Sequence, residues 1–149
     1  MSFEHDKKLH IWPLLVLSSF LFGGLIWWCI RTIREYNLQD DPMLCNLKQI
    51  LDPIHPEIKN LKLYRGKKSY TLNKDKIFLC LKDKNGQYYS INMLIYVFLH
   101  EFSHYLNKDD IGHTPKFYQI YEDLLYKAEK LGIYDPSIPP IKNYCGYTK

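Results

Sequence analysis

Residues 11–30 form a run of 20 residues without a charged side chain, and this run constrains the 149-residue chain more than any other feature. As a helix, at about 1.5 Å per residue, it is long enough to cross a hydrocarbon core of about 30 Å. Trp12 lies near one end of the run and Trp27 and Trp28 lie near the other, where interfacial aromatic residues belong. A cleaved signal peptide would have a shorter apolar region that ends in small residues. We therefore predict one transmembrane helix, with the lipid bilayer as its partner.

The other residues have room for one domain with appendages. We expect an N-terminal flank at 1–10, the transmembrane helix at 11–30, a stalk at 31–42, a folded domain at 43–135 and an extended proline-containing tail at 136–149. Lys7 and Lys8 before the apolar run nearly balance Arg31 and Arg34 after it. The positive-inside rule therefore leaves the orientation of this single-pass protein open.

Patterns within the expected domain indicate helices and strands together. Apolar residues at helical spacing predict helices at 43–51 and 115–131, the second ending at Gly132. Short apolar runs separated by turn-like segments predict antiparallel strands at 61–64, 70–72 and 77–81.

The sequence HEFSH, from His100 to His104, lies in the stretch 91–106, which is apolar on every side of a helix. Residues four apart share one helix face, so the two histidines can offer imidazole nitrogens to one metal ion while Glu101 reaches a water bound there. Without such a partner, these polar side chains would be costly to bury. The pattern predicts a zinc site with Glu101 as general base, over a dry floor formed by Met93 and Val97.

A third metal ligand is expected just beyond this helix. His113 precedes Thr114 and Pro115, which have the pattern of an N-cap and a first helical residue, so His113 would be held at a helix entrance. Asp110 is the main competitor, since carboxylates also bind zinc. His55, which lies between prolines, is expected to be an exposed loop residue.

HEFSH followed after a short loop by GHTPKFYQIYEDLLYKAEKLGIYD resembles the metal-binding core of the WLM and SprT-like metallopeptidases. The resemblance covers residues 77–135 and extends to versions of this domain that large DNA viruses encode. It implies Zn²⁺ held by His100, His104 and His113, Glu101 as the catalytic residue, and a protein or peptide substrate. The expected fold is α+β: a small zincin-like domain whose three- to four-stranded, mainly antiparallel sheet packs on the HExxH helix and a C-terminal helix.

The predicted function is peptide-bond hydrolysis by a membrane-anchored zinc-dependent metallopeptidase. In zinc peptidases of this plan an edge strand holds the substrate backbone by strand addition, and 77–81 is our choice for that strand. Tyr89, Tyr105 and Tyr144 are candidate oxyanion donors by residue type alone. The alternative is a non-catalytic structural or assembly protein, a virion membrane or minor capsid component with an inherited zinc site, whose partners are viral capsid or membrane proteins.

Segment 59–84 carries a net charge of +7, from nine Lys and Arg and two Asp. Lysines commonly protect sheet edges against aggregation. Anionic lipid headgroups are a second explanation for a membrane-tethered domain, and nucleic acid is a third. A membrane anchor and the lack of interleaved aromatic residues argue against nucleic acid without excluding it.

The four cysteines include no CxxC pair, so the metal prediction depends on histidine. Cys80 is expected to be a small core residue. Cys45 and Cys145 could pair only in an oxidising compartment, and the sequence leaves that pairing open.

Overall fold

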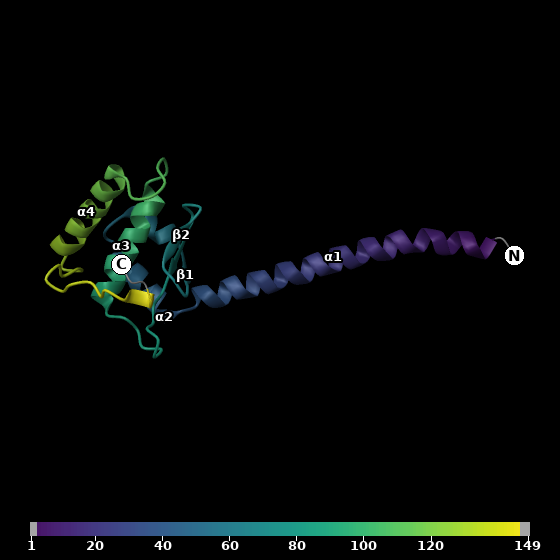
Figure 1. Cartoon of the computed structure of the whole chain (residues 1–149), viewed down its shortest axis with the longest axis horizontal. Helices are drawn as coiled ribbons and strands as arrows, with labels where there is room; N and C mark the ends of the chain where they lie inside the picture. The colour runs from purple at the N-terminus through teal and green to yellow at the C-terminus, as the bar shows by residue number, and fades with distance from the viewer. Residues whose placement is uncertain (1–2, 147–149) are drawn as a thin grey trace. The chain divides into compact units, whose positions relative to one another are not determined.

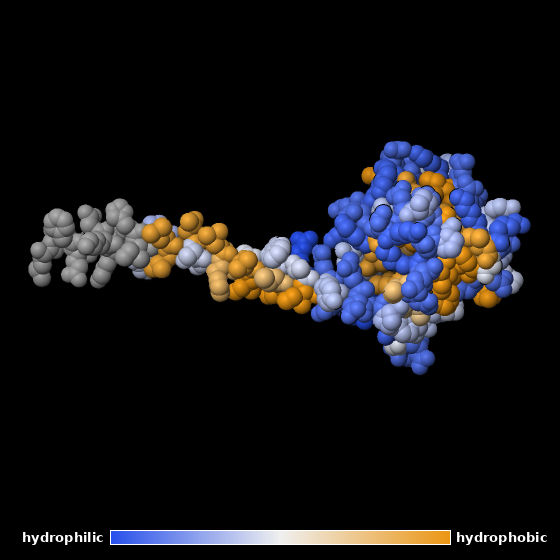
Figure 2. Space-filling model, turned by 180° about the vertical axis from the view of Figure 1, so that it is seen from behind, coloured by the Kyte–Doolittle hydropathy of each residue, from blue (hydrophilic) through white to orange (hydrophobic). Residues whose placement is uncertain are grey.

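The computed structural model describes residues 3–146, and the side chains among them from Trp12 onward. The chain divides into two units, one ending at Asn37 and the other beginning at Leu38. Helix α1 (Phe3–Gln39) makes up the described part of the first unit, and its last two residues are counted with the second (Figure 1). Its segment Trp12–Gln39 is long and apolar enough to cross a membrane, criteria that a signal sequence near an N-terminus would also meet. Figure 2 shows the exposed apolar side chains along this helix.

The second unit is an α+β domain, as predicted. Its elements in chain order are α2 (Pro42–Leu51), the 3-10 turn η1 (Pro56–Asn60), β1 (Lys62–Arg65), β2 (Tyr70–Leu72), β3 (Lys76–Leu79), α3 (Ile91–Leu106), α4 (Pro115–Lys130) and the 3-10 turn η2 (Tyr144–Gly146). Each α-helix of this domain begins and ends within a residue of its predicted bounds. Gly132 follows the last residues of α4 with a φ of +68°, the left-handed conformation that glycine adopts without strain.

The sheet is mixed and three-stranded, with strand order β1-β3-β2. Strand β1 pairs parallel to β3, and β2 pairs antiparallel to β3 on its other side. The prediction of a mainly antiparallel sheet was therefore wrong. The cause is the short connection from β1 to β2, which crosses the end of β3: the Gly66 N–H donates to the carbonyl of Leu79, and the Ser69 hydroxyl accepts from the backbone N–H of Cys80. A Cβ on Gly66 would lie 2.6 Å from the carbonyl oxygen of Lys68, so this crossing requires glycine.

Strand β3, which includes most of the segment predicted to bind substrate, is thus the central strand, and β2 is the edge strand beside α3. The outcome corrects the choice of 77–81 as the edge. Sequence patterns identify strands but do not reveal a crossover between them.

Helix α3 lies between the sheet and α4 (Figure 1). Its apolar residues are buried on both sides, because inward-facing strand residues cover one side and the amphipathic face of α4 covers the other. The fully buried core includes Leu94, Phe98, Phe102, Ile77 and Phe117. A helix enclosed in this way offers a rigid support for polar side chains along it.

Cys80 at the end of β3 forms a disulfide bond with Cys145 in the C-terminal tail. Cys80 is buried in the core, as predicted, but its disulfide partner was not predicted. Cys45 is exposed with a free thiol, so the pairing of Cys45 with Cys145 left open above does not occur. The tail up to Gly146 lies along the domain, and its last three residues, 147–149, are outside the described part of the chain.

Candidate metal centre

Helix α3 places His100 and His104 one turn apart, facing the entrance of α4. Ser90 is the N-cap of α3, with its side chain accepting from the backbone N–H of Met93, and Asn107 is the C-cap. His113 immediately precedes Thr114, the N-cap of α4, as predicted. The HExxH pattern and the capping pattern of the next helix therefore bring three histidines together.

The imidazole nitrogens of these histidines converge. Each offers a ligand atom within 4.8 Å of the other two. The Nε2 atom of His113 lies 3.2 Å from that of His104 and 3.0 Å from that of His100. Tetrahedral zinc with Zn–N bonds of about 2.0–2.1 Å places two ligand nitrogens roughly 3.3 Å apart. The donor set and spacing therefore fit a zinc ion. Among the described residues this is the one group of three or more such side chains with this property.

Asp110 was the alternative third ligand, but its carboxylate is engaged elsewhere. Its Oδ2 accepts a hydrogen bond from the hydroxyl of Thr114 at 3.1 Å, and the same hydroxyl accepts from the backbone N–H of Phe117. Asp110 lines the hollow around the histidines without joining their cluster. The arrangement favours His113 and gives Asp110 the task of bracing the loop that carries it.

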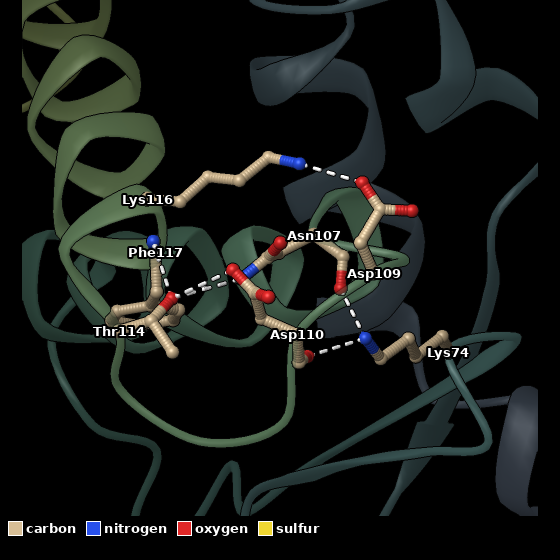
Figure 3. A network of polar contacts seen from close by, with 7 residues as sticks. All are labelled: Lys74, Asn107, Asp109, Asp110, Thr114, Lys116 and Phe117. Atoms are coloured by element: carbon tan, nitrogen blue, oxygen red, sulfur yellow. Dashed lines mark hydrogen bonds and ion pairs between the residues drawn. The ribbon is translucent and has the colours of Figure 1, made fainter.

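Lys74 holds this loop from the sheet side (Figure 3). Its ammonium group donates to the backbone carbonyl of Asn107 and, at 2.5 Å, to that of Asp110. In return, the ammonium group of Lys108 donates to the carbonyl of Lys74 at 2.6 Å. The turn between β2 and β3 is therefore tied to the loop between α3 and α4, and the cation lies at the C-terminus of α3, where the helix dipole favours it. No sequence motif indicated Lys74, because it lies 26 residues before His100.

Phe117 forms the apolar wall of the cluster. Its ring is fully buried, and its centroid lies 4.3 Å from that of His104, 4.7 Å from that of His113 and 5.0 Å from that of His100. Met93 and Val97, the predicted floor, are not among the residues that line the hollow, and the apolar surface against the three histidine rings comes from Phe117 of α4. The sulfur of Met93 accepts from the backbone N–H of Ile141 in the tail.

Glu101 faces the other side of the site, toward the edge strand. Its side chain is only 7% exposed, and the hydroxyl of Thr71 lies 2.9 Å from its Oε2. Burial raises the pKa of Glu101 to about 7, against the opposing effect of the Thr71 hydrogen bonds. A carboxyl group with such a pKa can both accept and release a proton near neutral pH.

Burial, followed by the electrostatic effects of His113 and Lys74, lowers the pKa of His104. A lowered pKa keeps the imidazole neutral, which is the form that binds a metal ion.

A hollow of about 580 Å³ opens onto these groups. Its walls include Tyr70 and Thr71 of β2, all three histidines, Glu101 and Ile111. The candidate oxyanion donors lie elsewhere: the Tyr89 hydroxyl accepts from the Cys145 N–H, Tyr144 is a buried residue of the tail itself, and Tyr105 lies beneath the ammonium group of Lys108. Their predicted role was wrong in this respect, since none of the three lines the hollow. His55 caps η1 and packs against Phe102, away from the cluster.

Similar proteins occur in viruses. Uncharacterized protein 136R of invertebrate iridescent virus 6 is 39% identical over an aligned length of 141 residues, covering 79% of this chain and 78% of the viral protein. Uncharacterized protein 042R of invertebrate iridescent virus 3 is 48% identical over 87 residues, covering 58% of this chain and 54% of that protein. Uncharacterized protein R325 of Acanthamoeba polyphaga mimivirus is 33% identical over 133 residues, covering 83% of this chain and 66% of that protein. No family model matches the chain, and no solved structure matches it. The chain belongs to the viral protein family that includes protein 136R of invertebrate iridescent virus 6.

Proposed function

We propose that this protein is a zinc-dependent metallopeptidase of the WLM and SprT-like kind, anchored in a membrane by α1. The observation that carries the proposal is the convergence of three histidine nitrogens beside a buried carboxylate, at the wall of an open hollow. His100, His104 and His113 would hold the ion. When bound there, zinc supplies Lewis acidity that lowers the pKa of a coordinated water and polarises a peptide carbonyl.

Glu101 acts as the general base. Its carboxylate accepts a proton from the attacking water and later delivers that proton to the leaving amine. Thr71 orients this carboxylate, because its hydroxyl lies in hydrogen-bonding distance of Oε2 and leaves Oε1 for the reaction. Glu101 is buried between β2 and its own helix except where it lines the hollow, so the carboxyl group has little contact with bulk water.

Strand β2 holds the substrate. It is an edge strand, and its residues Tyr70 and Thr71 line the hollow beside Glu101. An extended peptide can add to such an edge by backbone hydrogen bonds, which would place a peptide bond along the row of metal ligands. Recognition through the backbone suits unstructured protein segments as substrates.

The geometry favours catalysis over a purely structural zinc site. A structural site has four protein ligands, whereas a catalytic site keeps one position for water. Among residues 12–146, whose side chains are described, the metal-binding group has three ligands. The tail could have covered the site, but it is bonded to Cys80 at the opposite end of β3. A buried base next to the ligands has no use in a closed structural site.

Because α1 is long and apolar enough to cross a bilayer and the relatives are viral proteins, the proposed setting is a membrane of the infected cell or of the virion. A membrane-spanning helix keeps its protein in the membrane during extraction with alkaline carbonate. We therefore expect the full chain to stay in the membrane fraction after that treatment. Release of the full chain by that treatment would reject the anchor.

The test of the enzyme activity compares the full chain with its Glu101→Gln variant. We expect both to contain one zinc ion, and only the wild type to cleave an unstructured protein. Equal cleavage by both proteins would reject the mechanism, and a wild type with zinc but without cleavage would favour a structural role.

A further inference from the structure

Strand β2, which bears Thr71, is only three residues long. So short a strand needs support at both ends to hold a fixed position. Lys74 and Lys108 tie the turn at one end to the loop before α4. The other end, at Ser69, is held by a different set of contacts.

Ser69 is fixed by the disulfide-bonded tail. Its hydroxyl accepts from the backbone N–H of Cys80 at 3.0 Å and lies 3.2 Å from the hydroxyl oxygen of Tyr144. The Tyr144 hydroxyl donates to the carbonyl of Cys80, so the Ser69 hydroxyl donates to Tyr144. The two hydroxyls and the peptide groups of Cys80 thereby form a closed ring of hydrogen bonds.

Tyr144 is placed by its neighbours in the tail. It is 7% exposed and packs against Tyr89, with ring centroids 4.6 Å apart. The next residue, Cys145, is bound covalently to Cys80, and its backbone N–H donates to the Tyr89 hydroxyl at 3.0 Å. The disulfide is the covalent link of this segment to β3, and hydrogen bonds of Ile141, Tyr144 and Cys145 add to it.

We propose that Tyr144 is a positioning residue for Glu101, acting through Ser69 and Thr71, and that the Cys80–Cys145 disulfide makes this positioning sensitive to redox conditions. The proposal rests on the proposed function, in which Glu101 is the base. In the oxidised protein the tail fixes Ser69, two residues before Thr71, and Thr71 holds the carboxylate. In the reduced protein the tail leaves, and that end of β2 loses the hydrogen bond between Ser69 and Tyr144 while it keeps the one from the Cys80 N–H.

The disulfide is open to reagents because both cysteines line a hollow of about 650 Å³. A water-soluble phosphine reduces it as follows. Phosphorus gives two electrons to the sulfur pair and the S–S bond breaks. Water supplies the oxygen of the phosphine oxide and the two protons of the new thiols.

Amide hydrogen exchange of the full, zinc-loaded chain in lipid nanodiscs tests the proposal without relying on activity. We expect reduction, or Cys145→Ser, to accelerate exchange in Tyr70–Leu72 about tenfold or more, while the buried turns of α4 change less than about twofold. Tyr144→Phe, which keeps the ring and the disulfide, should give an intermediate acceleration of the same strand. Cys45→Ser removes an exposed cysteine outside the bridge and should change nothing.

Unchanged exchange in β2 would overturn the proposal, and so would equal acceleration of β2 and α4, which would show only a general loss of stability. Turnover of an unstructured protein gives the second readout: on reduction kcat should fall about tenfold, KM should rise because β2 also holds the substrate, and both should recover on reoxidation with glutathione disulfide. If the wild type has no peptidase activity at all, the proposed function fails, whereas the exchange experiment still decides whether the tail positions β2.

Discussion

The hydroxyl oxygen of Thr71 lies 2.7 Å from the backbone carbonyl oxygen of Glu101 and 2.9 Å from its Oε2. One hydroxyl has one hydrogen, so Thr71 donates to one of these oxygens at a time. When Glu101 is ionised, donation to the carboxylate stabilises the charge. When Glu101 is protonated, its own O–H can donate to Thr71, which then donates to the carbonyl. The contact between β2 and α3 therefore persists in both protonation states through which a general base passes.

Replacing Thr71 by Val should raise the pKa of Glu101, because the hydrogen bond from Thr71 favours the charged carboxylate. A hydrogen bond to a charged group contributes about 1.5–3 kcal/mol, and one pKa unit corresponds to about 1.4 kcal/mol. The acid limb of the pH profile of kcat/KM should therefore move up by about one unit. Thr71→Ser keeps the hydroxyl and should leave the profile in place; identical profiles for the two variants would show that this contact does not set the pKa.

Glu101→Gln should stabilise the metal-free protein at high pH. The pKa of Glu101 is about 7 in the fold against an ordinary value of 4.5, so the folded state binds more protons between these values. The contribution of Glu101 to the free energy of unfolding is thus greatest below pH 4.5 and falls as pH rises to 7, by about 3 kcal/mol at most. Gln carries no charge and avoids this loss.

Urea unfolding with a chelator present measures the effect. The difference between variant and wild type should be near zero at pH 4.5 and should grow until pH exceeds 7. Glu122→Gln, at an exposed position of α4, is the matched control and should show no such trend. A difference that is the same at every pH would contradict the raised pKa.

Local patterns predicted the helices and the histidines because the information is local. Ser90 and Thr114 begin helices as N-caps and Gly132 follows the end of one, all through interactions within a few residues, and the spacing from His100 to His104 is one helical turn. The sequence pointed to His113 as a ligand because the next residue, Thr114, has the pattern of a helix N-cap. Each of these features depends on fewer than a dozen consecutive residues.

The features that sequence reasoning missed depend on contacts between distant residues. The order of the strands follows from a crossing at Gly66 and Cys80, the wall of the site comes from Phe117, and the disulfide joins residues 65 positions apart. Lys74 and Thr71 reach the site only because β2 lies beside α3. Composition and periodicity carry no signal for such pairings, so a single sequence left them undetermined.

His113→Ala should abolish stable zinc binding. Even a lost second-shell partner costs about 10–100-fold in metal affinity, so loss of one of three ligands should cost more than about 100-fold. Metal analysis after dialysis against a weak chelator should find zinc in the wild type only. His55→Asn keeps a side-chain acceptor for the N–H of Glu57, removes a histidine outside the cluster, and should retain zinc. Full zinc content in His113→Ala would require another third ligand, with Asp110 the first to test.

Lys74→Met should weaken zinc binding although Lys74 touches no histidine ligand in the cluster. Its ammonium group bonds the carbonyls of Asn107 and Asp110, and removing it frees the loop that carries His113. We expect zinc affinity to fall by about tenfold, as for other residues that orient metal ligands. Competition with a fluorescent chelator measures this, with Lys116→Met as control, because Lys116 pairs with exposed Asp109 on the same loop. The Lys74→Met substitution also removes a positive charge near the proposed zinc ion. An affinity that rises instead would show that this repulsion outweighs the ordering of the loop.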